Sequence, residues 1–284
     1  MTKRSQPLPD SRARALLTGA PLKEIGLASL GAALAVWGLA GWVSTAAALA
    51  ALTLGTTAAI AVAAYVVSRR ADLAADRIEA RLTLDQLQQG VHDWRLATPF
   101  SAPPELLLRA AQELSRNKPP TVLELGAGVS TLILARIIRN QKLPCRLVSV
   151  DHDADYLATI AEEVEREHLD EIVTLLRSPL EPIDLDGYDG LWYRRETIGE
   201  VNDIGLLIVD GPPKRHGADI RYPALPVLAQ RLIPGALVLL DDARRRPERE
   251  ALRRWSRQFP RAESSFELVG HGLGLLRMPK DGEQ

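Results

Sequence analysis

The chain contains 44 consecutive residues (25–68) without a charged side chain or histidine, and this stretch constrains the fold more than any other feature. A helix of that length is about 66 Å long, roughly twice the ~30 Å hydrocarbon core of a bilayer. Two membrane spans joined by a tight turn are therefore expected. We predict a transmembrane helical hairpin over 24–68, with helices near 24–41 and 46–68 and its turn at Gly41–Thr45. A turn at Gly55–Thr57 is an alternative.

Charge divides the chain in the same place. Residues 1–70 carry a net charge of +5, and the rest carries −6, so the overall value of −1 conceals two regions. Positive charge flanks the apolar stretch on both sides, which predicts that both termini and the remaining domain face the cytoplasm at the cell (inner) membrane. Residues 1–23 are then a basic cytoplasmic N-terminus. The single cysteine, Cys145, excludes a disulfide framework and fits a reducing compartment.

Signal peptides and buried helices of soluble proteins also contain apolar stretches, so both compete with the membrane hairpin. A cleaved signal peptide has an apolar run of about 7–15 residues, which is several times too short. A buried helical hairpin of a soluble protein is the simpler alternative, because many of these residues are alanine.

Residues 69–97 keep helical periodicity and predict an amphipathic stalk on the membrane surface or pairing with a second copy as a homodimer. The apolar side chains expected on one side are Ile78, Leu82, Leu87, Val91 and Trp94. The proline-containing segment 98–104 then breaks the helix and marks the start of a domain over 98–284.

This domain alternates helices with short, continuously apolar strands, which predicts an α/β fold with a parallel sheet covered on both faces. Strands are expected at 121–125, 147–150, 172–176, 204–209 and 236–240, with a closing pair at 266–268 and 274–277. Helices are expected at 104–116, 130–140, 153–168, 218–232 and 249–259.

The first strand runs into a glycine-containing turn, Glu124–Thr131, where the backbone can approach a ligand. A dinucleotide-binding turn has a third glycine where this chain has Thr131, and Glu124 disfavours a pyrophosphate, so a nicotinamide enzyme is opposed. Asp151 follows the second strand, where an acid accepts hydrogen bonds from ribose hydroxyls. Ser178–Leu180 follows the third strand and can edge an adenine.

Four segments carry a resemblance to class I S-adenosylmethionine-dependent methyltransferases, closest to the cephalosporin-hydroxylase-like and catechol O-methyltransferase-like group. They are 122–131 (VLELGAGVST), 148–151 (VSVD), 208–213 (IVDGPP) and 239–242 (LLDD). The resemblance covers residues 100–278 and implies a Rossmann-like seven-stranded methyltransferase sheet that binds S-adenosylmethionine. The cofactor-binding residues that it implies are Glu124, Gly126, Ala127, Gly128, Ser130, Thr131, Asp151, His152, Ser178, Leu180 and Asp210.

Three carboxylates, Asp210, Asp241 and Asp242, end two neighbouring strands and repel one another unless a positive group lies between them. Oxygen ligands of this kind suit Mg²⁺, and related metal-dependent O-methyltransferases place acids at these positions. Lys214 falls where the catechol enzyme has its general base, and His216 is an alternative base. In the competing hypothesis, Asp210 contacts the cofactor, the acid pair caps the next segment and Lys214 is solvated.

Together these features predict a membrane-anchored methyltransferase that transfers a methyl group from S-adenosylmethionine to an acceptor, expected to be a hydroxyl, with possible metal assistance. Its acceptor is a small molecule, or a lipid or glycan at the membrane, bound by loops over 187–202 and 214–222. Arg244–Arg246 is expected to form a basic edge facing the membrane. The acidic balance of the domain argues against a nucleic-acid partner. The alternative is a non-catalytic binding or scaffold protein that retains the fold.

Overall fold

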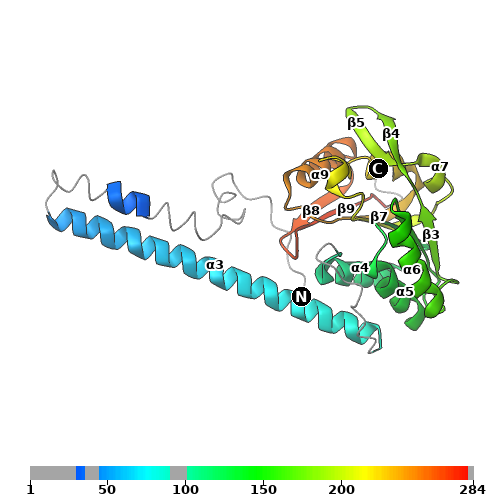
Figure 1. The fold of residues 1–284 in the computed structure, drawn as a ribbon, viewed down its shortest axis with the longest axis horizontal. Helices are drawn as coiled ribbons and strands as arrows, with labels where there is room; N and C mark the ends of the chain where they lie inside the picture. Colours follow the sequence, from blue (N-terminus) through cyan, green and yellow to red (C-terminus); the bar gives the residue numbers. More distant parts are fainter. Residues whose placement is uncertain (1–29, 36–44, 90–100, 281–284) are drawn as a thin grey trace. The chain divides into compact units, whose positions relative to one another are not determined.

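The computed structural model describes residues 30–35, 45–89 and 101–280 (Figure 1). The chain separates into two compact units, 6–75 and 76–284, and the boundary falls inside one long helix. Each unit is described by itself.

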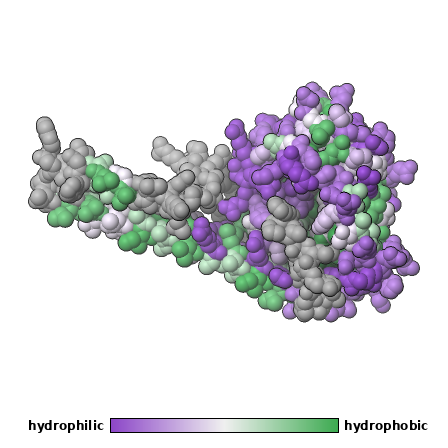
Figure 2. Space-filling view, in the orientation of Figure 1, coloured by the Kyte–Doolittle hydropathy of each residue, from purple (hydrophilic) through white to green (hydrophobic). Residues whose placement is uncertain are grey.

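The first unit contains a helical segment at 30–35 and most of helix α3, Thr45–Leu87. α3 is the one helix in the described ranges that is long and apolar enough to cross a membrane, by length and composition alone. Its apolar stretch is not buried, and hydrophobic side chains run along it in Figure 2.

The sequence predicted two spans, and the structure bears on the second one only. Most of the predicted first span, 24–41, and the predicted turn at 41–45 lie outside the described residues. The alternative turn at Gly55–Thr57 is wrong, because α3 passes through it without a break. There the hydroxyls of Thr53 and Thr57 each donate to the main-chain oxygen four residues earlier, both at 2.7 Å, as happens inside a continuous helix.

The predicted stalk is helical as far as Leu87, but its apolar face differs from the expected one. Ile78 and Leu82 are exposed, whereas Ala80 and Leu84 are buried in the second unit. Leu84 joins the hydrophobic core of that unit, and Leu87 packs against the core. The predicted contributions of Val91 and Trp94 lie outside the described residues.

A seven-stranded sheet forms the centre of the second unit, in the order β3-β2-β1-β6-β7-β9-β8. The first five strands in this order run parallel, and β9 is antiparallel to both of its neighbours, β7 and β8. The predicted seven-stranded α/β sheet is confirmed. The strands are β1 Thr121–Leu125, β2 Arg146–Asp151, β3 Val173–Arg177, β6 Ile204–Val209, β7 Leu232–Leu240, β8 Glu263–Glu267 and β9 Leu273–Arg277.

Apolar layers cover both faces of this sheet, as continuous apolar strands require. One layer is built from helices α4 Pro104–Asn117, α5 Val129–Asn140 and α6 Ala154–Arg166. The other contains the helices α7 Arg195–Ile198, α8 Ala224–Leu228 and α9 Arg246–Gln258, together with a two-stranded hairpin of β4 Leu180–Leu185 and β5 Tyr188–Tyr193.

Two parts of this second layer differ from the prediction. The hairpin and α7 occupy a segment where no element was expected. The predicted helix at 218–232 is wrong over most of its length: it is replaced by α8 and the 3₁₀ turn η2, Ala229–Arg231, while the 3₁₀ turn η1, Lys214–His216, lies before it. Pro223 and Pro226 account for this difference, since proline lacks the N–H that a longer helix needs at those places.

Candidate active site

The candidate site lies at the carboxyl edge of the sheet, around β1, where the order of the strands reverses. Parallel α/β sheets bind ligands at such a point. β1 is followed by a tight turn whose first residue, Gly126, has φ +103° and donates its N–H to the main-chain oxygen of Val150 at 2.8 Å. A Cβ at Gly126 would lie 3.1 Å from the nitrogen of Gly211 and 3.2 Å from the carbonyl carbon of Asp210. Both the conformation and the close approach therefore require glycine here.

Glu124 holds this turn in place from inside the protein. Its carboxylate is buried and accepts hydrogen bonds from Thr131 Oγ1 at 2.6 Å and Ser149 Oγ at 2.5 Å. Thr131 Oγ1 in turn accepts the N–H of Gly128 at 3.0 Å. Thr131 thus replaces the third glycine of a dinucleotide-binding turn with a hydroxyl that links the turn to Glu124. These bonds give Glu124 and Thr131 a positioning role.

Asp151, at the end of β2, heads a chain of polar contacts along the edge of the site. Its Oδ1 accepts the N–H of Asp153 at 2.9 Å and lies 3.0 Å from Nδ1 of His152. His152 Nε2 lies 3.2 Å from His216 Nε2, so the loop after β6 contacts the loop after β2. Burial, followed by the charges of His152 and Arg215, lowers the pKa of His216. Asp153 caps α6, as its position suggested, by accepting the N–H of Tyr156 at 3.1 Å.

Ser178 lies in the turn between β3 and β4 and is fully buried. Its N–H donates to the main-chain oxygen of Asp151 at 2.8 Å, and its hydroxyl donates to the main-chain oxygen of Arg194 at 3.3 Å. Its hydroxyl therefore joins the hairpin to the sheet. Leu180, the first residue of β4, is half-buried beside it.

Two tyrosines that the sequence did not single out also lie beside glycines of the site. The hydroxyl of Tyr156 lies 3.2 Å from where a Cβ of Gly128 would be, and the hydroxyl of Tyr193 lies 2.5 Å from the corresponding point at Gly211. Burial, followed by the charge of Asp151, raises the pKa of each phenol. The Tyr193 hydroxyl is buried and has no hydrogen-bond partner among the described residues, so it is available to a polar ligand.

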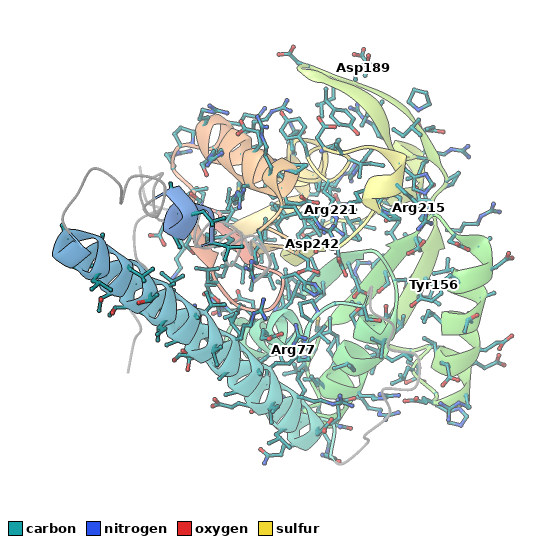
Figure 3. The ribbon with its side chains drawn as sticks, turned by 60° about the vertical axis from the view of Figure 1, so that its left-hand side comes forward. Arg77, Tyr156, Asp189, Arg215, Arg221 and Asp242 are labelled. Atoms are coloured by element: carbon teal, nitrogen blue, oxygen red, sulfur yellow. The ribbon has the colours of Figure 1, made fainter. Side chains whose placement is uncertain are left out.

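The three acids follow β6 and β7 as predicted, but a buried guanidinium lies among them. Arg221 contacts Asp210 Oδ1 and Asp242 Oδ2, each at 3.1 Å, and the labelled pair Arg221 and Asp242 is visible in Figure 3. Arg245 also contacts Asp242, at 2.6 Å. Burial, together with the charge of Asp241, raises the pKa of Asp210 well above its ordinary value. The sequence had predicted a metal ion to balance these charges, and Arg221 only as part of the acceptor-binding loop 214–222.

Lys214 does not join these acids in the structure. It is the first residue of η1, and its side chain is exposed. Its neighbour Arg215 is also exposed, with Nε 3.1 Å from Nε2 of His216. Tyr222, which was expected beside the substrate, is buried in the core, where Gln258 donates to its hydroxyl at 2.6 Å.

Comparison with known proteins shows which family the site resembles. Residues 123–243, which span the glycine turn and all three acids, match a family model described as a methyltransferase domain. This part of the chain is similar to a methyltransferase domain. Among curated proteins, none matches the sequence significantly.

Solved structures that resemble the second unit share little sequence with it. An SAH-bound methyltransferase from Podospora anserina is 15% identical, with 71% of this chain and 88% of that chain covered and a TM-score of 0.48. An O-methyltransferase from Bacillus cereus in complex with SAH is 16% identical, with 70% and 90% covered and a TM-score of 0.49. A methyltransferase from Geobacter sulfurreducens is 20% identical, with 71% and 89% covered and a TM-score of 0.43. At these values the likenesses do not establish a substrate for this chain.

Proposed function

We propose that the chain is a membrane-anchored methyltransferase that transfers a methyl group from S-adenosylmethionine to a hydroxyl acceptor. The observation that carries the proposal is the meeting of three features at one sheet edge, inside a domain that matches the methyltransferase family. They are the glycine turn at Gly126–Gly128, the acid Asp151 after β2 and the acid Asp210 after β6.

The residues at this edge fit the methyl donor. The main-chain N–H groups of Ala127 and Ser130, which flank the first residue of α5 and its cap, suit its carboxylate, since helix N-termini favour anions. The N–H of Gly128 is held by Thr131 Oγ1, so Gly128 contributes its backbone conformation. Asp151, with His152 beside it, suits the ribose hydroxyls. The unpartnered hydroxyl of Tyr193 supplies a further polar contact. Ser178 and Leu180 supply the turn expected beside the adenine.

The donor supplies an electrophilic methyl group on a positively charged sulfur. The protein then has to hold the acceptor oxygen in line with that methyl group and to remove the hydroxyl proton. Asp210 lies next to the glycine turn, and its carboxyl is paired with Arg221. Lys214 and His216 lie on the loop that follows, and we propose that Lys214 or His216 accepts the proton.

Helix α3 supports the anchoring part of the proposal. Its apolar stretch is long enough to cross a bilayer and is not buried in protein, so a membrane can supply its apolar surroundings. An acceptor at the membrane, a lipid or a lipid-linked glycan, then lies within reach of the domain. The basic residues at 244–246 are proposed to face that surface.

The test is calorimetric binding of S-adenosylhomocysteine to the full-length chain, followed by methyl transfer from labelled S-adenosylmethionine to hydroxyl acceptors in membrane extracts. Asp151→Ala is expected to weaken binding about 10–100-fold, which corresponds to losing hydrogen bonds to a charged group. Asp155→Ala, in the exposed first turn of α6, is the matched control and should bind as the unmodified chain does. Absence of binding by the unmodified chain would contradict the proposed function.

A further inference from the structure

Arg221 is a buried cation at the carboxyl ends of the two strands that bear the acids. Its side chain is 7% exposed, and its two terminal nitrogens contact different acids, Nη2 with Asp210 Oδ1 and Nη1 with Asp242 Oδ2. Burial lowers the pKa of Arg221, but the carboxylates of Asp210, Asp242 and Asp241 outweigh this effect and raise it. An arginine guanidinium carries a positive charge in proteins whatever its surroundings.

The same guanidinium binds the main chain of both strand ends. Nη2 donates to the main-chain oxygen of Asp210, and Nη1 donates to that of Asp241 at 3.2 Å. Nε lies 3.5 Å from the main-chain oxygen of Pro212. Arg221 thus connects the segment after β6 with the segment after β7. Its planar fork suits such simultaneous contacts, which a lysine cannot reproduce.

This arrangement does not fit a divalent cation on the three predicted ligands. Mg²⁺ needs several oxygen atoms converging at about 2.0–2.1 Å on one point. Among the described residues, the group of three ligand atoms that all lie within 4.8 Å of one another belongs to Asp241, Asp242 and His271. Asp210 is not in this group, although its carboxyl contacts that of Asp241. Asp242 is also bound by both Arg221 and Arg245, so a dication there would meet two fixed positive charges.

We propose that Arg221 takes the place of a divalent metal ion in this methyltransferase domain. The guanidinium neutralises the acids at the ends of β6 and β7 and fixes their positions, so donor binding and methyl transfer proceed without a divalent cation. Arg221 is a positioning residue, because it acts through Asp210 and Asp242. The part concerning methyl transfer rests on the proposed function, whereas the part concerning metal binding does not.

The direct test is titration of the full-length chain with Mn²⁺, followed by electron paramagnetic resonance of free Mn²⁺, with Mg²⁺ as competitor. The unmodified chain is expected to show no site tighter than about 1 mM. Arg221→Ala removes the internal cation and is expected to bind one Mn²⁺ at least tenfold more tightly. Arg245→Ala is the matched control, since it removes an arginine from the same acid but from a 38% exposed position. It should not gain a site.

Arg221→Lys separates charge from folding. It keeps a cation among the acids, so it should bind no Mn²⁺ even if its stability falls. If Arg221→Ala does not fold, the unmodified chain and Arg221→Lys still decide the question.

Stoichiometric Mn²⁺ binding by the unmodified chain, lost in Asp241→Asn, would overturn the proposal. Saturating EDTA should leave the affinity for S-adenosylhomocysteine unchanged, and a tenfold loss would overturn the proposal as well. Failure of the proposed function would instead appear as no S-adenosylhomocysteine binding under any condition.

Discussion

At the residue scale, the ion pair between Arg136 and Glu167 offers a defined test of stability. Arg136 is 1% exposed, and its Nε lies 2.7 Å from Glu167 Oε2, while Nη1 contacts Gln88 Oε1 at 3.0 Å. Glu167→Gln leaves a buried guanidinium without its counter-charge. We expect the free energy of unfolding to fall by about 3 kcal/mol, measured by urea denaturation.

The same residue gives a prediction about pH. The hydrogen bonds from Arg136 lower the pKa of Glu167, although burial opposes them. An acid with a lowered folded-state pKa adds stability above its ordinary value of 4.5, and that stability is lost as the pH falls through the folded value. The unmodified chain should therefore lose more stability between about pH 5 and pH 3 than Glu167→Gln does. Parallel pH curves for the two proteins would contradict this.

Residue types at strand ends were readable from the sequence, but their partners were not. Asp151, Asp210 and Asp241 could be placed together because the carboxyl ends of parallel strands meet at one edge. The burial of Arg221 was not predictable, since an arginine in a polar loop is ordinarily solvated. Tyr193 was missed because its strand carries no strong signal in the sequence.

At the element scale, the end of α3 is predicted to stabilise the second unit through Leu84. Leu84 is fully buried in the core with residues of α4 and α5, whereas Leu82, two positions earlier, is 58% exposed. Leu84→Ala should reduce the free energy of unfolding by about 3 kcal/mol, as buried leucine truncations do. Leu82→Ala is the matched control and should change it by less than about 0.5 kcal/mol. Equal effects of the two variants on the urea midpoint would contradict the observed burial.

The elements that were predicted and those that were missed differ in burial. β1 and β6 were predicted to the residue, because each is a continuous apolar run buried on both faces. Strand β4 contains only half-buried and exposed positions and includes Pro182, so it does not stand out from a loop. The face of α3 was mispredicted for a related reason: Ile78 and Leu82 are more apolar than Ala80, but burial depends on which side meets α4 and α5.

At the scale of the whole molecule, the proposed membrane anchor predicts how the chain fractionates. The full-length protein should remain with membranes after a carbonate wash, because the exposed apolar stretch of α3 requires apolar surroundings. Replacing both Leu54 and Ile60 with arginine should move most of it into the soluble fraction. Each arginine at a helix centre costs about 2.5–3.5 kcal/mol of insertion free energy.

The same two changes at Ile78 and Leu82 provide the control for this experiment. These residues are also exposed on α3, at 61% and 58%, but they lie beyond the uncharged stretch that ends before Arg69. If the membrane contacts only the uncharged stretch, the control variant should remain in the membrane fraction. If the helix acts instead as a general apolar surface for protein partners, both double variants should be released alike. Recovery of the unmodified chain in the soluble fraction would contradict the membrane anchor. If that soluble protein still bound the methyl donor, the proposed methyltransferase activity would remain, without the anchor.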